Sequence, residues 1–387
     1  MNGFRGYERP DGTVGARNYV AIIPSVACAN GVVSAIAREV PETIPLYHGH
    51  GCGRGAARDL ELHFRALAGL GKNPNVGAAL VVGLGCEVIK ADFLAGVIAE
   101  TGKPVEVFEI QSEGGSRSAA RKGGKIARKM LALIEHVERK EADVERLILG
   151  LKCGGSDSLS GVTANPMVGE VTDRVVAAGG TAILTENTEM IGTSHILERR
   201  ACCPDVAARV KEMVGTADRL TRDIMGPLAS LVIAPGNMEG GMSSIQEKSL
   251  GCIAKAGTSK IMEVVDYAEA PSEKGLILMD GPGYDIESMT GLAAAGTQVM
   301  LFTTGRGNPI GYPIVPVIKI ASNTRLYRAM EDDMDVDAQA SLDCRTLEEA
   351  GEELERLVLS VLEGEQTKAE LNRQDGIICP YTTSPSF

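Results

Sequence analysis

Short apolar runs alternate along the chain with longer amphipathic segments, and this alternation limits the fold more than any other feature. We expect strands at residues 19–24, 78–84, 105–110, 146–151, 181–184, 275–279, 298–302 and 315–320. We expect helices at residues 31–40, 56–68, 91–101, 118–139, 167–178 and 347–362. Strands that alternate with helices form βαβ units and parallel sheets. Because the runs are continuously apolar, both faces of each sheet should be covered.

The charged stretch at residues 135–145 gives the clearest domain boundary, because it separates a long amphipathic segment from the next apolar run. A chain of 387 residues has room for two or three domains. We predict an α/β protein with two Rossmann-like parallel-sheet domains, one over residues 1–143 and one over residues 144–387. Ligand loops are expected at the carboxyl ends of the strands.

The composition excludes some classes of partner. The net charge is −12, from 51 acidic and 39 basic residues, so nucleic acid is not an expected partner. We find no apolar run of membrane-spanning length and no signal peptide, so we expect a cytoplasmic protein without a membrane partner. The nine cysteines have an odd count and no regular spacing, which is typical of free thiols in a reducing compartment.

Two loops in the N-terminal half combine metal-ligating residue types. His48, His50 and Cys52 alternate with glycines, and an extended backbone would place all three side chains on one side. Imidazole and thiolate suit Fe²⁺, Zn²⁺ or Mn²⁺, although a flexible turn with a stray histidine has the same pattern. Cys86 and Glu87 follow a predicted strand, at the edge where a parallel sheet binds ligands.

The loop after the run at residues 146–151 is the most polar of the predicted ligand loops. A loop that only turned the chain would need neither a thiol nor a carboxylate, but this one contains both, together with hydroxyls and an amide, from Cys153, Ser156, Asp157, Thr163 and Asn165.

A pair of carboxylates follows the run at residues 181–184. Glu186 and Glu189 are three residues apart, so a helix starting here would direct both toward one cation. The alternative interpretation is that these residues cap the helix.

Later loops supply groups that suit an anionic substrate. Arg306 lies between two glycines and is placed to clamp a carboxylate. Lys248 is expected either to bind a second anionic group or, if desolvated, to act as a base. Asn237 and Thr304 lie in loops of the same polar, glycine-rich kind.

Together these residue types indicate a centre that eliminates water from a hydroxylated acid. A divalent cation polarises the carboxylate while a base removes the α-proton and an acid protonates the departing hydroxyl. We expect a divalent metal ion, and the family resemblance given below implies Fe²⁺, with Mn²⁺ or Mg²⁺ as alternatives. A single ion is favoured over an iron–sulfur cluster because the cysteines form no compact motif.

Each candidate residue is assigned a role on this basis. The expected metal ligands are His48, His50, Cys52, Cys86, Cys153, Glu186 and Glu189. The expected catalytic residues are Lys248, Glu87, His50 and Asp157. Base and acid are left open among Lys248, His50, Glu87 and, as the weakest candidate, His195. The expected substrate-binding residues are Arg306, Asn165, Ser156, Thr163, Asn237 and Thr304.

The sequence resembles the altronate/galactarate dehydratase family, specifically its large subunit or C-terminal catalytic part without the small SAF domain. The resemblance runs from about residue 5 to residue 337, and its tail at residues 374–381 departs from the family's usual ending. The motifs that carry the resemblance are residues 12–18, 50–53, 73–76, 83–87, 153–157, 160–166, 235–237, 247–251, 280–285 and 302–307.

The resemblance implies an iron-activated hydro-lyase that converts a hexonate or hexarate to a 2-keto-3-deoxy acid, with its catalytic domain at residues 144–387. Longer family members carry a small SAF domain, so the resemblance implies either that a separate small subunit supplies this domain or that the protein works without it. We also expect a homo-oligomer. Two alternatives stay open. One is the large subunit of sulfolactate sulfo-lyase, which belongs to the same family and releases sulfite. The other is a non-catalytic subunit that binds a sugar acid.

Overall fold

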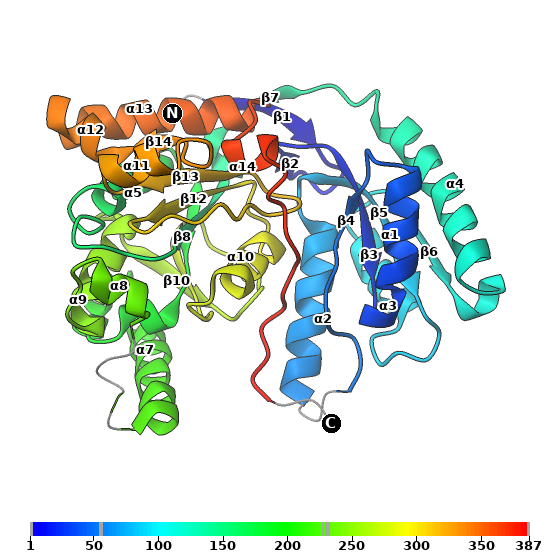
Figure 1. The fold of residues 1–387 in the computed structure, drawn as a ribbon, viewed down its shortest axis with the longest axis horizontal. Helices are drawn as coiled ribbons and strands as arrows, with labels where there is room; N and C mark the ends of the chain where they lie inside the picture. Colours follow the sequence, from blue (N-terminus) through cyan, green and yellow to red (C-terminus); the bar gives the residue numbers. More distant parts are fainter. Residues whose placement is uncertain (1–2, 54–56, 227, 229–232, 385–387) are drawn as a thin grey trace.

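The computed structural model describes residues 3–53, 57–226, 228 and 233–384, and two parallel sheets flanked by helices form its framework (Figure 1). The strands are β1 (Phe4–Glu8), β2 (Val14–Gly15), β3 (Tyr19–Pro24), β4 (Ile44–Pro45), β5 (Val76–Gly83), β6 (Val105–Glu109), β7 (Lys140–Ala142), β8 (Ile148–Cys153), β9 (Thr181–Leu184), β10 (Ile261–Val265), β11 (Gly275–Met279), β12 (Val299–Thr304), β13 (Val317–Ala321) and β14 (Val336–Asp337). The helices are α1 (Asn30–Glu39), α2 (Ala57–Lys72), α3 (Ala91–Ala99), α4 (Ser116–Ile134), α5 (Ala164–Ala177), α6 (Ser194–Arg199), α7 (Pro204–Met225), α8 (Pro235–Glu239), α9 (Ile245–Cys252), α10 (Asp285–Ala294), α11 (Thr324–Ala329), α12 (Ala338–Cys344), α13 (Leu347–Leu362) and α14 (Lys368–Leu371), with a 3₁₀ turn η4 at Asn187–Met190.

The predicted fold class is confirmed. Within the described residues, a four-stranded parallel sheet has the order β4-β3-β5-β6, and a seven-stranded parallel sheet has the order β10-β11-β9-β8-β12-β13-β14. β1 pairs antiparallel with β2 and β7 in a small third sheet. The larger sheets lie on either side of residue 143, where we place the domain boundary.

The strand order of the larger sheet creates a ligand-binding position. β8 leads through α5 to its neighbour β9 on one side, and β12 leads to its neighbour β13 on the other side. β8 and β12 are parallel neighbours, and successive strands are added to the sheet in opposite directions on either side of this pair. Loops diverge at such a switch point and leave a crevice at the carboxyl edge, where α/β proteins bind ligands.

The two parallel sheets share one hydrophobic core. Leu67 and Leu70 of α2 join Met289 and Leu292 of α10 in a continuous buried cluster. At Gly69 an added Cβ would lie only 2.4 Å from the backbone oxygen of Ala294, so glycine permits this close helix contact.

The C-terminal tail crosses from one sheet's domain to the other, as the red trace in Figure 1 shows. The backbone N–H of Ile378 donates to Tyr47 O at 3.0 Å. Asp59 of α2 is fully buried and accepts hydrogen bonds from Thr383 and Ser384, including one of 2.7 Å from Thr383 N. The tail therefore ties the end of the chain to the N-terminal half.

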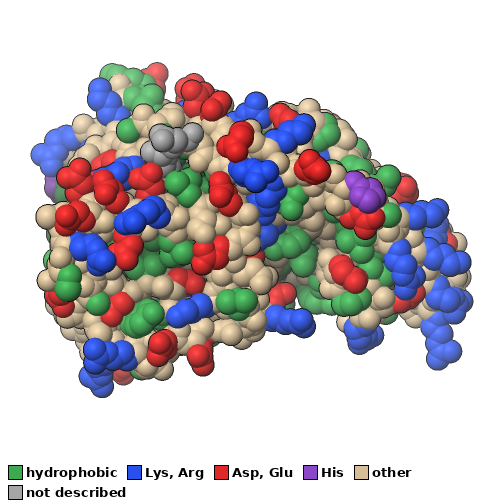
Figure 2. Space-filling view, turned by 90° about the horizontal axis from the view of Figure 1, so that it is seen from above, with side chains coloured by type: hydrophobic (Ala, Val, Ile, Leu, Met, Phe, Trp, Pro, Cys, Tyr) green, Lys and Arg blue, Asp and Glu red, His purple; other side chains and the backbone are tan. Residues whose placement is uncertain are grey.

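One end of the molecular surface is rich in basic side chains. Figure 2 shows Lys and Arg side chains gathered at the end of the molecule where α4 lies, and its basic residues are exposed. α4 buries small and apolar side chains such as Ala127 and Met130 on its other face. Among the described residues, every helix is too short or too polar to cross a membrane.

Candidate active site

Two thiols meet one carboxylate below the carboxyl edge of the seven-stranded sheet. Cys153 ends β8, Glu189 follows β9, and Cys252 ends α9. The Sγ atoms of Cys153 and Cys252 lie 2.5 Å and 2.9 Å from Glu189 Oε2, and 3.5 Å from each other. All three side chains are buried. Three potential metal ligands from three separate segments therefore lie close together.

Glu186 is held beside this cluster by an unusual backbone conformation. Its φ of 75° lies in the left-handed region, which is strained for a residue other than glycine. The conformation lets Oε2 accept a 2.9 Å hydrogen bond from Cys153 N, while Oε1 contacts Lys152. Strain of this kind persists where the surrounding structure enforces it, as at binding sites.

Lysine side chains surround the two carboxylates. Lys248 Nζ lies 2.5 Å from Glu189 Oε1, Lys255 Nζ lies 3.5 Å from Glu186 Oε2, and Lys152 also pairs with Asp285 at 2.8 Å. Lys152 and Lys255 are almost fully buried. A buried charge is tolerated only when it is paired, so these ammonium groups and carboxylates stabilise each other.

The pKa values of the cluster follow from burial and these charges. Burial by itself raises the pKa of Glu189, but Lys248, Lys255 and Lys152 outweigh it and lower the pKa to about 2. Burial lowers the pKa of Lys248, but Glu189 and the two thiols outweigh it and raise the pKa above its ordinary value. The ion pair with Glu189 favours the anion-binding role of Lys248 over its role as a base, and both roles stay predictions.

The donor set suits a transition metal. Within the described part of the chain, Cys153, Glu189 and Cys252 form the only group of three or more Cys, His, Asp or Glu side chains whose ligand atoms lie within 4.8 Å of one another. Thiolate and carboxylate donors fit Fe²⁺ or Zn²⁺ better than Mg²⁺. Ser249, one turn before Cys252, is fully buried and its Oγ has no partner among the described residues. This orphaned hydroxyl is compatible with a further ligand at the centre.

Cys252 is the member of this group that we did not predict. It lies at the end of α9 rather than in a glycine-rich loop after a strand. Cys252 is four residues after Lys248, so both side chains lie on one face of the helix. That spacing is the sequence signal that could have pointed to Cys252.

Asp157, expected to be catalytic, instead holds three loops together. Its Oδ1 accepts hydrogen bonds from Ser160 Oγ and Ser322 Oγ, both at 2.7 Å, and its Oδ2 accepts one from Asn323 at 2.9 Å. An added Cβ at Gly305 would lie 2.3 Å from Oδ1. Asp157 therefore organises the loops of the crevice, and its direct part in proton transfer stays a prediction.

Most of the expected substrate-binding side chains also support these loops. Asn165 bonds Gly251 O and Thr303, Thr163 donates to Ser322 O, and Thr304 donates to Gly155 O. Asn237 Oδ1 accepts from the backbone N–H of Ser156 at 2.9 Å.

Arg306 differs from these loop-supporting residues. Its side chain is 42% exposed, and its guanidinium pairs with the exposed Glu239 at 2.8 Å. It remains accessible to an anionic ligand.

Both ring nitrogens of His48 form hydrogen bonds with the backbone around it. Its Nε2 bonds Pro24 O at 2.6 Å, and its Nδ1 accepts from His50 N at 3.1 Å, so neither ring nitrogen faces a ligand. Burial lowers the pKa of His48 to about 4. The ring of His50 packs 4.3 Å from that of His63. The expected metal role of His48 is therefore replaced by a structural one.

Glu87 likewise stabilises the loop after β5. Its carboxylate accepts from Ser25 Oγ at 2.7 Å and from Gly85 N at 2.6 Å. Burial raises the pKa of Glu87, but these hydrogen bonds outweigh it and lower the pKa, which disfavours the expected acid–base role. Cys52 and Cys86 are exposed thiols and do not join the group at Cys153.

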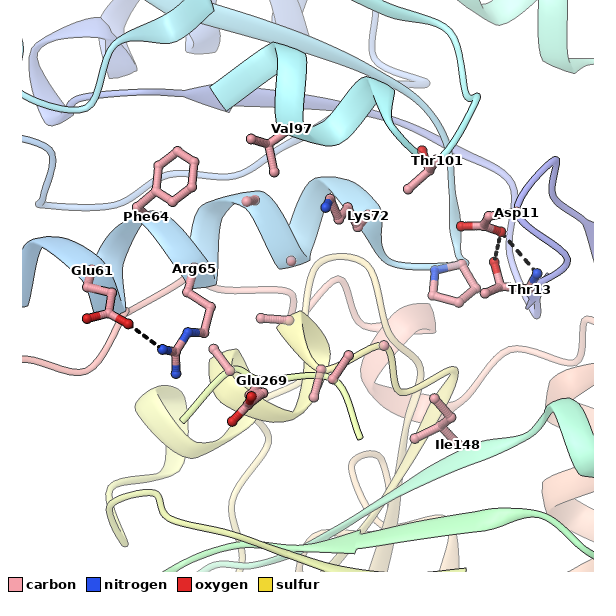
Figure 3. A pocket seen from close by; sticks show the side chains of 18 residues that line it. Asp11, Thr13, Glu61, Phe64, Arg65, Lys72, Val97, Thr101, Ile148 and Glu269 are labelled. Atoms are coloured by element: carbon pink, nitrogen blue, oxygen red, sulfur yellow. Dashed lines mark hydrogen bonds and ion pairs between the residues drawn. The ribbon is translucent and has the colours of Figure 1, made fainter. Parts of the chain in front are cut away.

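A pocket of about 570 Å³ lies elsewhere, along α2 (Figure 3). Its lining is mainly apolar, with Phe64, Val97 and Ile148, and the Glu61–Arg65 ion pair lies at its rim. It contains none of the residues that we assigned to chemistry.

Comparison with known proteins identifies the family. Residues 144–384 match the family described as D-galactarate/Altronate dehydratase, C-terminal, and residues 6–135 match D-galactarate dehydratase/Altronate hydrolase, second domain. The chain belongs to the D-galactarate/altronate dehydratase family. Because the match continues to residue 384, our expectation that the tail departs from the family is wrong.

Three relatives illustrate the range of this family. The (2R)-sulfolactate sulfo-lyase subunit beta of Chromohalobacter salexigens is 38% identical over 370 residues, which cover 95% of this chain and 94% of that protein. Altronate dehydratase of Bacillus subtilis is 36% identical, with coverage of 87% and 68%. Galactarate dehydratase (L-threo-forming) of Escherichia coli is 35% identical, with coverage of 94% and 73%. These relatives are lyases, and this chain is a lyase.

Proposed function

We propose that this lyase is a metal-dependent hydro-lyase that dehydrates a sugar acid to a 2-keto-3-deoxy acid. The substrate is a hexonate such as altronate or a hexarate such as galactarate. One observation carries the proposal. The buried side chains of Cys153, Cys252 and Glu189 lie close together at the switch point of the larger sheet. Relatives named as dehydratases support the choice of reaction.

The centre would hold Fe²⁺ through the two thiolates and the Glu189 carboxylate. When bound, the ion supplies a positive charge that polarises the substrate's carboxylate and favours loss of the α-proton. Thiolate donors make Fe²⁺ a better candidate than Mn²⁺ or Mg²⁺.

The chain's own groups would bind and orient the acid. Lys248 is 11% exposed and offers an ammonium beside Glu189, while Arg306 offers a guanidinium at the outer loops. Each can bind one anionic or hydroxyl end of a short polyhydroxy acid. The loops tied by Asp157 would fix the separation of these groups.

We also propose that a small second subunit with an SAF domain completes the enzyme. The relative from Chromohalobacter salexigens supports this, because it is named as one subunit of a sulfo-lyase.

A second candidate function is release of sulfite from (2R)-sulfolactate. It is favoured by one specific observation, the match over 94% of the sulfo-lyase subunit's own length. Both eliminations begin with removal of an α-proton and differ in the departing group, so the same centre serves either reaction.

The test is turnover under anaerobic conditions with Fe²⁺. The protein is offered altronate, galactarate and (2R)-sulfolactate, with and without a small SAF subunit, and 2-keto-3-deoxy acid and sulfite are measured. Keto acid that disappears in Cys153→Ala and Cys252→Ala, but not in Cys344→Ser at the exposed Cys344, supports the dehydratase. Release of sulfite alone would establish the second candidate. If no acid gives a product, the chain is better explained as a non-catalytic subunit that binds a sugar acid.

A further inference from the structure

Cys202 and Cys203 are the only adjacent cysteines in the sequence, and the proposed metal centre does not use them. Both are exposed free thiols, whereas Cys153 and Cys252 of the candidate centre are buried. Two accessible thiols on consecutive residues can react with each other, because one can resolve the oxidised form of the other. The pair therefore has the residue types of a reversible redox site.

The pair lies where an extended segment at the edge of the larger sheet becomes helix α7. Ala201 forms a parallel β-bridge with Ile261 of the edge strand β10, and Cys202 N donates to Ile261 O at 2.9 Å. Cys203 is the N-cap residue of the 22-residue helix α7. Its carbonyl oxygen accepts a hydrogen bond from Ala207 N at 3.1 Å. The backbone is thus held on both sides of the pair.

The two thiols lie side by side, although consecutive side chains of a straight strand face opposite ways. The chain bends at both cysteines instead of continuing as a strand. Desolvation, followed by a hydrogen bond with the Cys203 thiol, raises the pKa of Cys202. The two sulfur atoms are therefore within hydrogen-bond distance of each other.

The contacts of Cys202 give the two sulfurs different roles. Cys202 Sγ also donates to Met262 O at 3.5 Å. The thiolate is the reactive form of cysteine, and the raised pKa of Cys202 disfavours that form. We therefore expect Cys203 to meet an oxidant first and Cys202 to resolve the product.

A disulfide between these residues would be easy to reduce. Consecutive Cα atoms lie about 3.8 Å apart, whereas the Cα atoms of bridged cysteines are usually about 4.4–6.8 Å apart. Strained and exposed disulfides are the labile ones, and they are typical of regulatory rather than structural bonds. The bond would form under an oxidant and be reversed by a thiol.

We propose that Cys202 and Cys203 form a reversible redox site that hydrogen peroxide oxidises to a disulfide. The Cys203 sulfur attacks one peroxide oxygen, the O–O bond breaks, and a sulfenic acid and one water form. The Cys202 sulfur then attacks the sulfenic sulfur, the S–O bond breaks, and the hydroxyl leaves as a second water. Two electrons and two protons pass from the thiols to the peroxide, and a thiol reductant returns them.

The test is peptide mapping of the full-length protein after treatment with hydrogen peroxide in the presence of a metal chelator. Residues 201–209 form one tryptic peptide, bounded by Arg200 and Arg209, that contains both thiols. A disulfide inside this peptide makes it two hydrogen atoms lighter, a change that bonds to other cysteines do not produce. We expect the lighter peptide after peroxide treatment and its complete reversal by dithiothreitol.

Serine variants test the order of attack. In Cys202→Ser the sulfenic acid on Cys203 has lost its neighbouring thiol, so dimedone should trap it. Cys203→Ser should give far less dimedone adduct. The matched control is Cys344→Ser, which removes another exposed thiol and should leave the oxidation of peptide 201–209 unchanged.

Three results would overturn the proposal. One is a peptide 201–209 whose two thiols both still react with iodoacetamide after peroxide has oxidised Cys344. The second is sulfinic acid on Cys203 without a disulfide, because that product is not reversed by a thiol. The third is a dimedone adduct that forms only in Cys203→Ser. None of these measurements uses turnover, so they decide on the redox site whether or not the proposed function holds.

Discussion

At the scale of single residues, one carboxylate oxygen organises the centre. Glu189 Oε2 contacts the thiols of both Cys153 and Cys252, and the surrounding lysines keep the carboxylate ionised. We predict that Cys252→Ser weakens Fe²⁺ binding by more than the about 10–100-fold that loss of an outer-shell partner typically costs. Competition with a chelator measures the affinity. Cys344→Ser, at an exposed thiol, should bind as the parent does.

Asp157 provides a second residue-scale prediction. Asp157→Asn turns one acceptor into an amide donor that faces the Asn323 amide, now 2.9 Å away. Removing one such hydrogen bond should lower the free energy of unfolding by about 1–3 kcal/mol, measured by urea unfolding of the metal-free protein. Unchanged stability with abolished turnover would instead return Asp157 to a catalytic role.

At the scale of elements, helix contacts depend on particular glycines. Gly69→Ala should separate α2 from α10, because the new Cβ would meet backbone atoms of Ala294. Gly96 in α3 is the matched control, since a Cβ there meets nothing within 4 Å. We predict lower thermal stability for Gly69→Ala and a gain of about 0.5–1 kcal/mol for Gly96→Ala. Equal effects would mean that the α2–α10 contact relaxes freely.

The elements also show what a sequence can predict. The runs at residues 19–24, 181–184 and 275–279 coincide with β3, β9 and β11, because continuous apolar runs bounded by glycine or polar residues describe buried parallel strands. β10 was missed because Glu263 interrupts its apolar pattern, and β4 and β14 are only two residues long.

The site was only partly predictable for a related reason. Cys153 and Glu189 were predicted as ligands because loops after strands carry ligands, and the structure brings their side chains together. Cys252 lies at the end of a helix, outside the predicted ligand loops. Only the fold shows that it is buried against Cys153 and Glu189.

At the scale of the whole molecule, the tail is secured by a carboxylate with a shifted pKa. Burial raises the pKa of Asp59, but hydrogen bonds from Ser384 and Thr383 outweigh it and lower the pKa from 3.8 to about 2. Since the folded-state pKa is depressed, its stabilisation is present above the unfolded value and is lost as the pH falls through the folded value.

The parent should therefore be more stable than Asp59→Asn near neutral pH, and the difference should shrink between pH 3.8 and about 2. Urea unfolding of both proteins across this range measures it. A difference that does not change with pH would contradict an ionised Asp59 as the anchor of the tail.

The most direct test is an anomalous-diffraction map at the iron edge, from crystals grown anaerobically with Fe²⁺. We predict one peak bounded by Cys153, Glu189 and Cys252, and its loss in Cys252→Ser crystals. A peak at His50, Cys52 and Cys86, with none at Cys153, would contradict the assignment of the metal centre to the switch point of the larger sheet.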